Sequence, residues 1–163
     1  RYSSEMLEEM LVSFEEHYYA NHHHHLTPYA GIAELLESLS SRGAHIAVVS
    51  LKPRRAGERE IDLTGLRSLI DLSVWGDDVE RAKPEPDGVL RAMSGFGVDP
   101  SSTLVIGDSP ADIMMGRAAG TRTAAALWGG SSRERLLAES PDLALEEPGD
   151  LLKAIAARQH LLA

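Results

Sequence analysis

Two aspartates that follow an apolar segment are the first residues whose spacing suggests chemistry. Asp108 comes directly after the segment 103–107, and Asp112 follows four residues later. The segment predicts a strand buried on both faces, and the spacing places both carboxylates on one side of the next helical turn. Carboxylate oxygens suit Mg²⁺ when waters and a phosphate complete its coordination shell. A second interpretation is that Ser109 or Asp108 is the N-cap of the helix and that Asp112 is a first-turn acid that interacts favourably with the helix dipole.

Further residues suited to binding an anion follow two other segments. Ser50 ends the apolar segment 45–50, where a hydroxyl and backbone N–H groups at a turn can hold a phosphate oxygen. Lys83 precedes two prolines that stiffen its loop and can fix an ammonium near an anion. Simpler explanations remain for each residue taken alone: a serine that caps a loop, and a surface lysine at the start of a helix.

These residues are positioned by an alternation of helices and strands from residue 31 onward. Helices are expected over 5–22, 31–42, 86–93, 108–119, 133–137 and 150–160, and strands over 45–50, 72–75, 103–107, 121–127 and 143–145. Residues 51–60 have no clear assignment. The alternation predicts an α/β fold, a Rossmann-like parallel sheet with flanking helices. Ligands of such sheets bind beyond the carboxyl ends of the strands, so the polar residues are expected at one edge.

Composition excludes several classes of protein. The 163 residues contain 43% hydrophobic and 25% charged residues, which is typical of one globular domain. The net charge of −9 argues against binding to nucleic acid, and the lack of cysteine excludes disulfide scaffolds and thiol catalysis. No segment is long and apolar enough to span a membrane, so no membrane partner and a cytoplasmic location are expected. The chain opens with Arg1 rather than Met, which suggests that an upstream segment exists.

A run of four histidines, His22 to His25, is the one low-complexity segment. Imidazoles can bind a transition metal, but consecutive residues at a helix end point in different directions around its axis. A solvated or tag-like run is the preferred interpretation.

Three motifs in order resemble those of the haloacid dehalogenase superfamily, and most closely its phosphoglycolate phosphatase-like branch. They are Ser-Leu-Lys-Pro at 50–53, Lys-Pro-Glu-Pro-Asp at 83–87 and Gly-Asp-Ser-Pro-Ala-Asp-Ile at 107–113. Their order and gaps together are more specific than any one of them. The segment Tyr29-Ala30-Gly31 resembles the link from the family's helical cap back to its core. The resemblance implies two domains: the last helix of the cap over residues 1–25 and the α/β core over 26–163.

The resemblance also implies roles for individual residues. Ser50 and Lys83 would act on the transferring phosphoryl group, and Lys52 would contact the substrate. Asp108 would hold Mg²⁺, and Asp112 would support the metal directly or through water. The implied function is a Mg²⁺-dependent phosphatase that acts on a small phosphorylated metabolite.

The sequence departs from the family at its first motif. The family carries an Asp-x-Asp pair on its first strand, with a nucleophile and a general acid–base, and no Asp-x-Asp occurs in these 163 residues. That strand lies in the middle of the family's sheet, between the strands expected at 45–50 and 103–107. Its absence leaves two unpaired edges, so we expect the strands to close up, another chain to fill the gap, or the missing piece to exist elsewhere. The edges also favour self-association. The alternative function is a truncated or degenerate protein that binds phosphate or a partner without catalysis.

Overall fold

The computed structural model describes residues 3–21 and 26–160. Its helices are α1 (Ser4–Asn21), α2 (Ile32–Ser41), α3 (Arg54–Thr64), α4 (Asp87–Phe96), α5 (Pro110–Ala118), α6 (Arg133–Ala138) and α7 (Asp150–His160). Its strands are β1 (Ala47–Val49), β2 (Leu72–Val74), β3 (Leu104–Gly107), β4 (Arg122–Ala126) and β5 (Leu143–Leu145). Short 3₁₀ helices occur at 67–69, 76–78 and 100–102.

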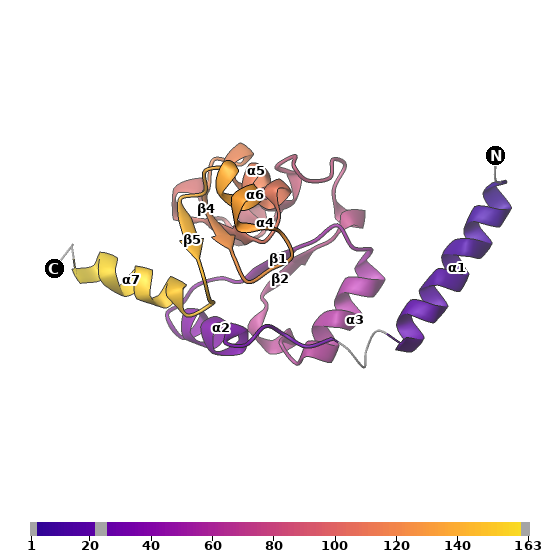
Figure 1. The fold of residues 1–163 in the computed structure, drawn as a ribbon, viewed down its shortest axis with the longest axis horizontal. Coiled ribbons are helices and arrows are strands. Elements are labelled where there is room, and N and C mark those ends of the chain that lie inside the picture. The colour runs from indigo at the N-terminus through magenta and orange to yellow at the C-terminus, as the bar shows by residue number, and fades with distance from the viewer. Residues whose placement is uncertain (1–2, 22–25, 161–163) are drawn as a thin grey trace.

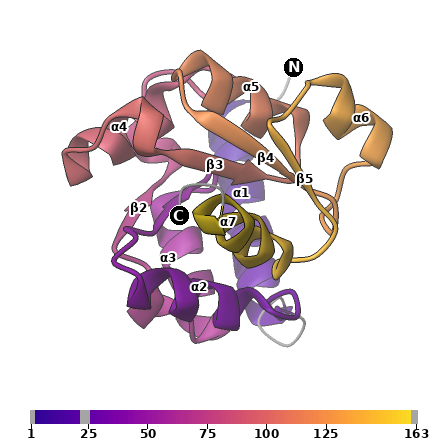
Figure 2. The same ribbon diagram turned by 90° about the vertical axis from the view of Figure 1, so that its left-hand side faces the viewer.

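The strands form two parallel sheets. One sheet pairs β1 with β2, and the other has the order β3-β4-β5. Parallel strands need crossover connections, and here helices supply them on both faces (Figures 1 and 2). The predicted α/β fold with parallel strands and flanking helices is therefore confirmed.

Helices cover the strands in two layers: α2 and α3 lie on one side of the strands, and α4, α5 and α6 lie on the other (Figure 2). On the first side, Leu35 of α2 packs with residues of β4, β5 and α7. On the second side, a cluster of Val89, Met93, Met115 and Ala119 joins α4 to α5. Val49 of β1 and Val105 of β3 both pack against this second cluster, so apolar contacts connect the two sheets.

A cavity of about 380 Å³ separates β1 from β3. It is lined by residues of both strands, including Ala47, Val49 and Val105, and by side chains of α4 and α5. Within the described residues the strands have therefore not closed up, which removes one of the three expected outcomes. Ile106 of β3 lines the same cavity and is 38% exposed, so an apolar strand edge faces open space.

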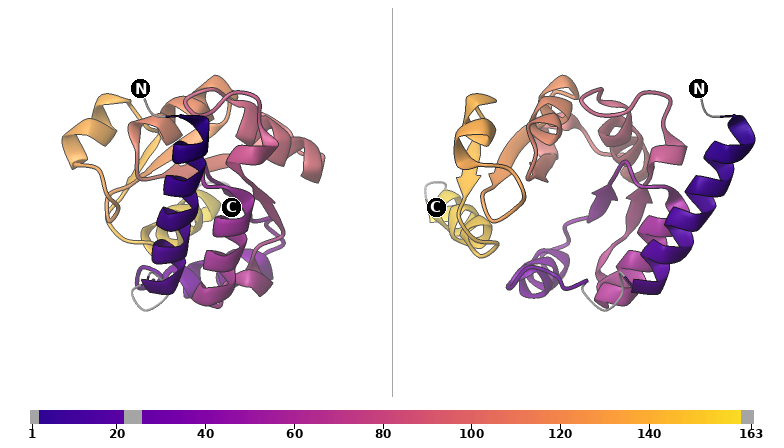
Figure 3. Two further views of the ribbon diagram at one scale, coloured as in Figure 1. Left: turned by 90° about the vertical axis from the view of Figure 1, so that its right-hand side faces the viewer. Right: turned by 45° about the vertical axis from the view of Figure 1, so that its right-hand side comes forward.

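Helix α1 runs beside α3 on the side of the molecule away from α7 (Figure 3). The hydroxyl of Tyr18 in α1 donates a hydrogen bond of 2.7 Å to Oε1 of Glu60 in α3. The predicted boundary between a cap helix and the α/β core, near residue 25, stays a prediction. The histidine run His22 to His25 lies outside the described residues. No helix within the described ranges is long and apolar enough to cross a membrane.

Helix α3 occupies residues that the sequence left unassigned. Its sequence is strongly charged, and its buried residues are Ala56, Gly57 and Ile61. A Cβ on Gly57 would lie 2.0 Å from the ring of Trp75, so this helix packs closely over the residue that follows β2. The helix is stabilised by a tertiary contact with a small residue, and apolar periodicity does not report such a contact.

Candidate functional site

An ion pair joins two of the predicted site residues. The Nζ atom of Lys83 lies 2.6 Å from Oδ1 of Asp112. Both side chains are largely buried, with 16% of Lys83 and 11% of Asp112 exposed. Lys83 lies in the loop that leads from β2 to α4, and Asp112 lies in the first turn of α5 after β3. The structure therefore brings the ends of two strands from different sheets into direct electrostatic contact.

Asp112 is also part of the N-terminal cap of α5. Its Oδ2 atom accepts hydrogen bonds from the backbone N–H and the hydroxyl of Ser109, and the Ser109 hydroxyl accepts one from the Asp112 N–H. This reciprocal pattern is a capping box, so the capping interpretation is confirmed for Asp112. Gly107 makes room for the arrangement, because a Cβ there would lie 2.1 Å from the Cβ of Asp112.

Asp108 lies in the turn between β3 and α5 and faces the loop after β4. Its Oδ2 atom accepts a 2.8 Å hydrogen bond from the backbone N–H of Gly130. A Cβ on Gly129 would lie 2.1 Å from the Cβ of Asp108. The loop after β4 can approach Asp108 this closely because glycine has no side chain. Within the described residues Oδ1 of Asp108 accepts no hydrogen bond, which leaves one carboxylate oxygen for a ligand.

Ser50 and Lys83 line the same small cavity, together with Met115 of α5. The cavity is about 10 Å³, which is room for roughly one water molecule. The Ser50 hydroxyl accepts a 3.2 Å hydrogen bond from the Lys52 N–H, and the Ser50 N–H donates to the Val74 carbonyl. Ser50 thus also stabilises its own turn, as the simpler interpretation expected.

The structure thus pairs Lys83 with Asp112 and places Ser50 and Lys83 on one small cavity, whereas the contacts of Asp108 are with the loop after β4. Lys52 does not join Ser50 and Lys83 with its side chain. Its ammonium pairs instead with Glu60 of α3, and 43% of the Lys52 side chain remains exposed. The expectation that Lys52 contacts the substrate stays a prediction.

The residues at this edge can bind a magnesium ion only when a phosphate supplies further oxygen ligands. Within residues 3–21 and 26–160, no three His, Asp or Glu side chains gather to hold a metal ion by themselves. Asp108 offers one carboxylate oxygen, whereas both oxygens of Asp112 already accept hydrogen bonds. Mg²⁺ is commonly bound by one or two carboxylates together with water and phosphate oxygens, so the donor set fits Mg²⁺ in the presence of a phosphate.

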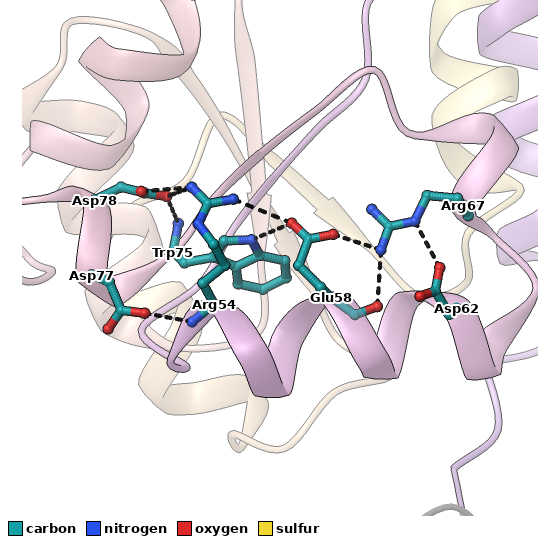
Figure 4. Close-up of polar contacts among 7 residues, drawn as sticks. All are labelled: Arg54, Glu58, Asp62, Arg67, Trp75, Asp77 and Asp78. Atoms are coloured by element: carbon teal, nitrogen blue, oxygen red, sulfur yellow. Dashed lines mark hydrogen bonds and ion pairs between the residues drawn. The ribbon is translucent and has the colours of Figure 1, made fainter.

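A charged network holds the loop after β2 against α3 (Figure 4). The indole N–H of Trp75 donates a 2.7 Å hydrogen bond to Glu58, and the Trp75 backbone N–H donates one to Asp78. Arg54 forms a two-pronged pair with Asp78 at 2.6 and 2.7 Å, and Arg67 pairs with Glu58. The Trp75 hydrogen bond holds the pKa of Glu58 below its ordinary value, and the Arg54 guanidinium lowers the pKa of Asp78. The network fixes the start of the loop that carries Lys83.

Sequence reasoning noted Gly129 only as part of the family resemblance, with no role, and it missed Gly130 and Glu60. Gly129 and Gly130 admit and bind Asp108, and Glu60 binds the Lys52 ammonium. The glycine pair follows the predicted strand 121–127 after one residue, Trp128, and a close backbone approach there could have been inferred from it. Glu60 gives no such signal, because its contact depends on how α3 packs.

Comparisons with known proteins agree with this geometry. The model of a family described as haloacid dehalogenase-like hydrolase matches residues 1–126. The chain is 39% identical over 146 residues to a phosphoglycolate phosphatase from Aquifex aeolicus, covering 90% of this chain and 67% of that protein. It is 34% identical over 150 residues to the pyrophosphatase PpaX from Bacillus velezensis, covering 92% of this chain and 69% of that protein.

Solved structures show the same fold. A crystal structure described as a predicted phosphoglycolate phosphatase from Haemophilus somnus superposes with a TM-score of 0.84 at 24% identity, covering 95% of this chain and 69% of that chain. A hydrolase from Pseudomonas syringae superposes with a TM-score of 0.81 at 25% identity, covering 96% and 71%. The chain thus spans about seven tenths of each of these structures.

Proposed function

Since this chain belongs to the haloacid dehalogenase-like hydrolase family, we propose that it provides the phosphate-binding and metal-binding part of a Mg²⁺-dependent phosphatase. The observation that carries the proposal is the pairing of Lys83 with Asp112 beside Ser50, at the edge where Asp108 has a free carboxylate oxygen. The ends of the parallel strands carry a hydroxyl, an ammonium and two carboxylates, and this set of groups is suited to stabilise a phosphoryl group.

Each side chain has one part in the proposed chemistry. The Ser50 hydroxyl donates a hydrogen bond to a phosphoryl oxygen, and the Lys83 ammonium neutralises negative charge that develops there. Asp112 keeps that ammonium in place through its 2.6 Å contact, and Asp108, whose Oδ2 atom is bound by Gly130, would hold the metal ion. The metal, when bound, supplies additional positive charge to the phosphoryl oxygens. Both Asp112 oxygens already accept hydrogen bonds, so Asp112 would support a bound metal directly only if one of these hydrogen bonds were given up, and otherwise through water.

The nucleophile is the part that these residues do not supply. No Asp-x-Asp occurs in the sequence, and the cavity between β1 and β3 has the place and the exposed edge that a further parallel strand would need. We propose that a strand with this motif fills the cavity and completes the enzyme. The relatives named above support a small phosphorylated substrate, with phosphoglycolate and pyrophosphate as the compounds to test first.

Phosphate binding tests the part of the function that this chain provides. Calorimetry with inorganic phosphate, with and without Mg²⁺, should show binding that Mg²⁺ strengthens. Lys83→Met should weaken it by about tenfold or more, since a charge-assisted contact to phosphate is lost. Lys153→Met removes an exposed lysine that pairs with Glu147 and Asp150, and it should leave phosphate binding unchanged. Equal binding by all three proteins would contradict the proposed site.

Catalysis is tested by adding the missing strand as a peptide. We expect no hydrolysis of an aryl phosphate by the 163 residues, and Mg²⁺-dependent hydrolysis when an extended Asp-x-Asp-Gly-Thr peptide is present. A control peptide with Asn in place of the first Asp should bind without restoring hydrolysis, because it lacks the nucleophile. Phosphate binding without hydrolysis under any of these conditions would favour the alternative, a non-catalytic phosphate-binding protein. This alternative is motivated by the lack of the motif itself.

A further inference from the structure

Three residues from three separate segments meet beside the phosphate site. Lys52 follows β1, Glu60 lies in α3 and Tyr18 lies in α1. The Lys52 ammonium forms an ion pair with Oε2 of Glu60, and the Tyr18 hydroxyl donates a 2.7 Å hydrogen bond to Oε1 of the same carboxylate. One carboxylate therefore binds a group from the strand-end turn and a group from helix α1 at the same time.

The main chain of Lys52 belongs to the site even though its side chain points to α3. Its N–H donates to the Ser50 hydroxyl, and its carbonyl accepts a 3.1 Å hydrogen bond from the Gly76 N–H. A Cβ on Gly76 would lie 2.5 Å from the carbonyl oxygen of Leu51, so the turns after β1 and β2 are in close contact. A change in where the Lys52 side chain is held would therefore be transmitted directly to the turn that carries Ser50.

Because the Glu60 carboxylate is mostly buried, it holds the Lys52 ammonium firmly. Only 15% of the Glu60 side chain is exposed, against 43% for Lys52. A charge that is shielded from water interacts more strongly with its partner than an exposed charge does. The Lys52 ammonium is thus neutralised by a carboxylate that cannot easily leave, and an anion that arrives at Ser50 must compete with Glu60 for it.

We propose that Glu60 is a positioning residue that sets the location of the Lys52 ammonium and couples it to the docking of helix α1 through Tyr18. This proposal deepens the proposed function and rests on it, because the anion in question is the phosphate at Ser50 and Lys83. With α1 docked, Glu60 holds Lys52 away from the phosphate. Loss of the Tyr18 hydrogen bond removes one of the contacts that hold the carboxylate, so Lys52 reaches the anion more readily.

The first experiment measures the dissociation constant of inorganic phosphate in the full chain by calorimetry. Glu60→Gln releases the ammonium, and phosphate should bind about three- to tenfold more tightly. Tyr18→Phe should tighten binding by a smaller factor, although Tyr18 is not part of the phosphate site. In a Lys52→Met background neither substitution should have an effect, because the group that they control is gone. Glu37→Gln on the exposed face of α2 is the matched control and should bind like the parent chain.

Two outcomes of this experiment would overturn the proposal. One is unchanged or weaker phosphate binding by Glu60→Gln. The other is an effect of Tyr18→Phe that persists in the Lys52→Met background, since that effect would not pass through the ammonium. A merely structural role for Glu60 would lower stability without producing this dependence on Lys52.

The second experiment needs no phosphate and so separates this proposal from the proposed function. The chain contains no cysteine, so Ser13→Cys on α1 and Ser94→Cys on α4 provide two exposed spin-label sites. Pulsed electron resonance should give a narrow distance distribution that broadens alike in Tyr18→Phe, Glu60→Gln and Lys52→Met. Unchanged distributions in all three would overturn the coupling to α1. If the parent chain binds no phosphate but these distributions broaden, the proposed function fails and the coupling stands.

Discussion

The Nζ atom of Lys83 lies 2.6 Å from Oδ1 of Asp112, although 29 positions separate the two residues in the chain. This contact joins the loop after β2 to the first turn after β3, and these strands belong to different sheets. A lysine in this position can neutralise an anion only while its own carboxylate partner stays in place. The pair therefore supports the fold, and under the proposed function it also positions the ammonium for phosphate.

Removing Asp112 should affect folding and binding together. Asp112→Leu leaves the buried Lys83 ammonium without its partner and removes half of the capping box of α5. We expect the free energy of unfolding to fall by about 1–3 kcal/mol, the usual cost of an unsatisfied buried polar group. Urea denaturation measures this change. Glu134→Leu on the exposed face of α6 is the control, and an equal loss in both variants would contradict the importance of the pair.

The close approaches at Gly107 and Gly129 predict that alanine is not tolerated at either position. The added Cβ would lie 2.1 Å from the Cβ of Asp112 in the first case and from that of Asp108 in the second. Each variant should melt at a lower temperature, and Gly129→Ala should also weaken the effect of Mg²⁺ on phosphate binding, because it displaces Asp108. Gly149→Ala has its nearest neighbour at 3.9 Å and should melt like the parent chain. Melting of Gly129→Ala at the parent temperature would count against the geometry.

The network around Trp75 predicts a stability that depends on pH. The folded state lowers the pKa of Glu58, mainly through the Trp75 hydrogen bond, below its ordinary value of 4.5. A lowered carboxylate pKa stabilises the fold at pH values above the ordinary pKa, and this contribution is lost as the pH falls through the folded pKa. Glu58→Gln can still accept the indole hydrogen bond but carries no charge. It should therefore be less stable than the parent at pH 7, and the difference should shrink below pH 4.5.

The measurement is urea unfolding followed by tryptophan fluorescence at several pH values. Glu139→Gln, at the end of α6 and distant from Trp75 in sequence, serves as the control for loss of one negative charge. A difference between parent and Glu58→Gln that stays constant from pH 7 to pH 3 would show that the charge of Glu58 has no part in stability.

The cavity between β1 and β3 predicts that the two sheets unfold separately. The chain has two tryptophans, and Trp75 follows β2 of one sheet whereas Trp128 follows β4 of the other. Labelling with fluorotryptophan gives one ¹⁹F resonance for each. As urea is added, the two resonances should change at different concentrations, since no backbone pairing joins the sheets within the described residues. Coincident, cooperative transitions of a monomer would contradict this picture.

Much of the fold and part of the site could be predicted from the sequence. The segment before Asp108 is apolar and β-branched, and it is followed by an N-cap and a helix, so local preferences agree with the final structure there. For residues 54–64 the local sequence did not predict the observed helix. Helix α3 packs a glycine against Trp75 and does not bury an apolar stripe that the sequence would show. The place of the Lys52 side chain was likewise unpredictable, since its partner Glu60 is brought near only by tertiary packing.

The cluster that contains Val89 and Met93 touches Val49 on one sheet and Val105 on the other. Side chains of α4 and α5 consequently bridge the two sheets beside the cavity, where no backbone pairing joins them within the described residues. Met93→Ala should bring the facing edges of β1 and β3 closer together without a change in the sequence of either strand. If a further strand fills the cavity as proposed, side chains of α4 and α5 would be part of its packing surface.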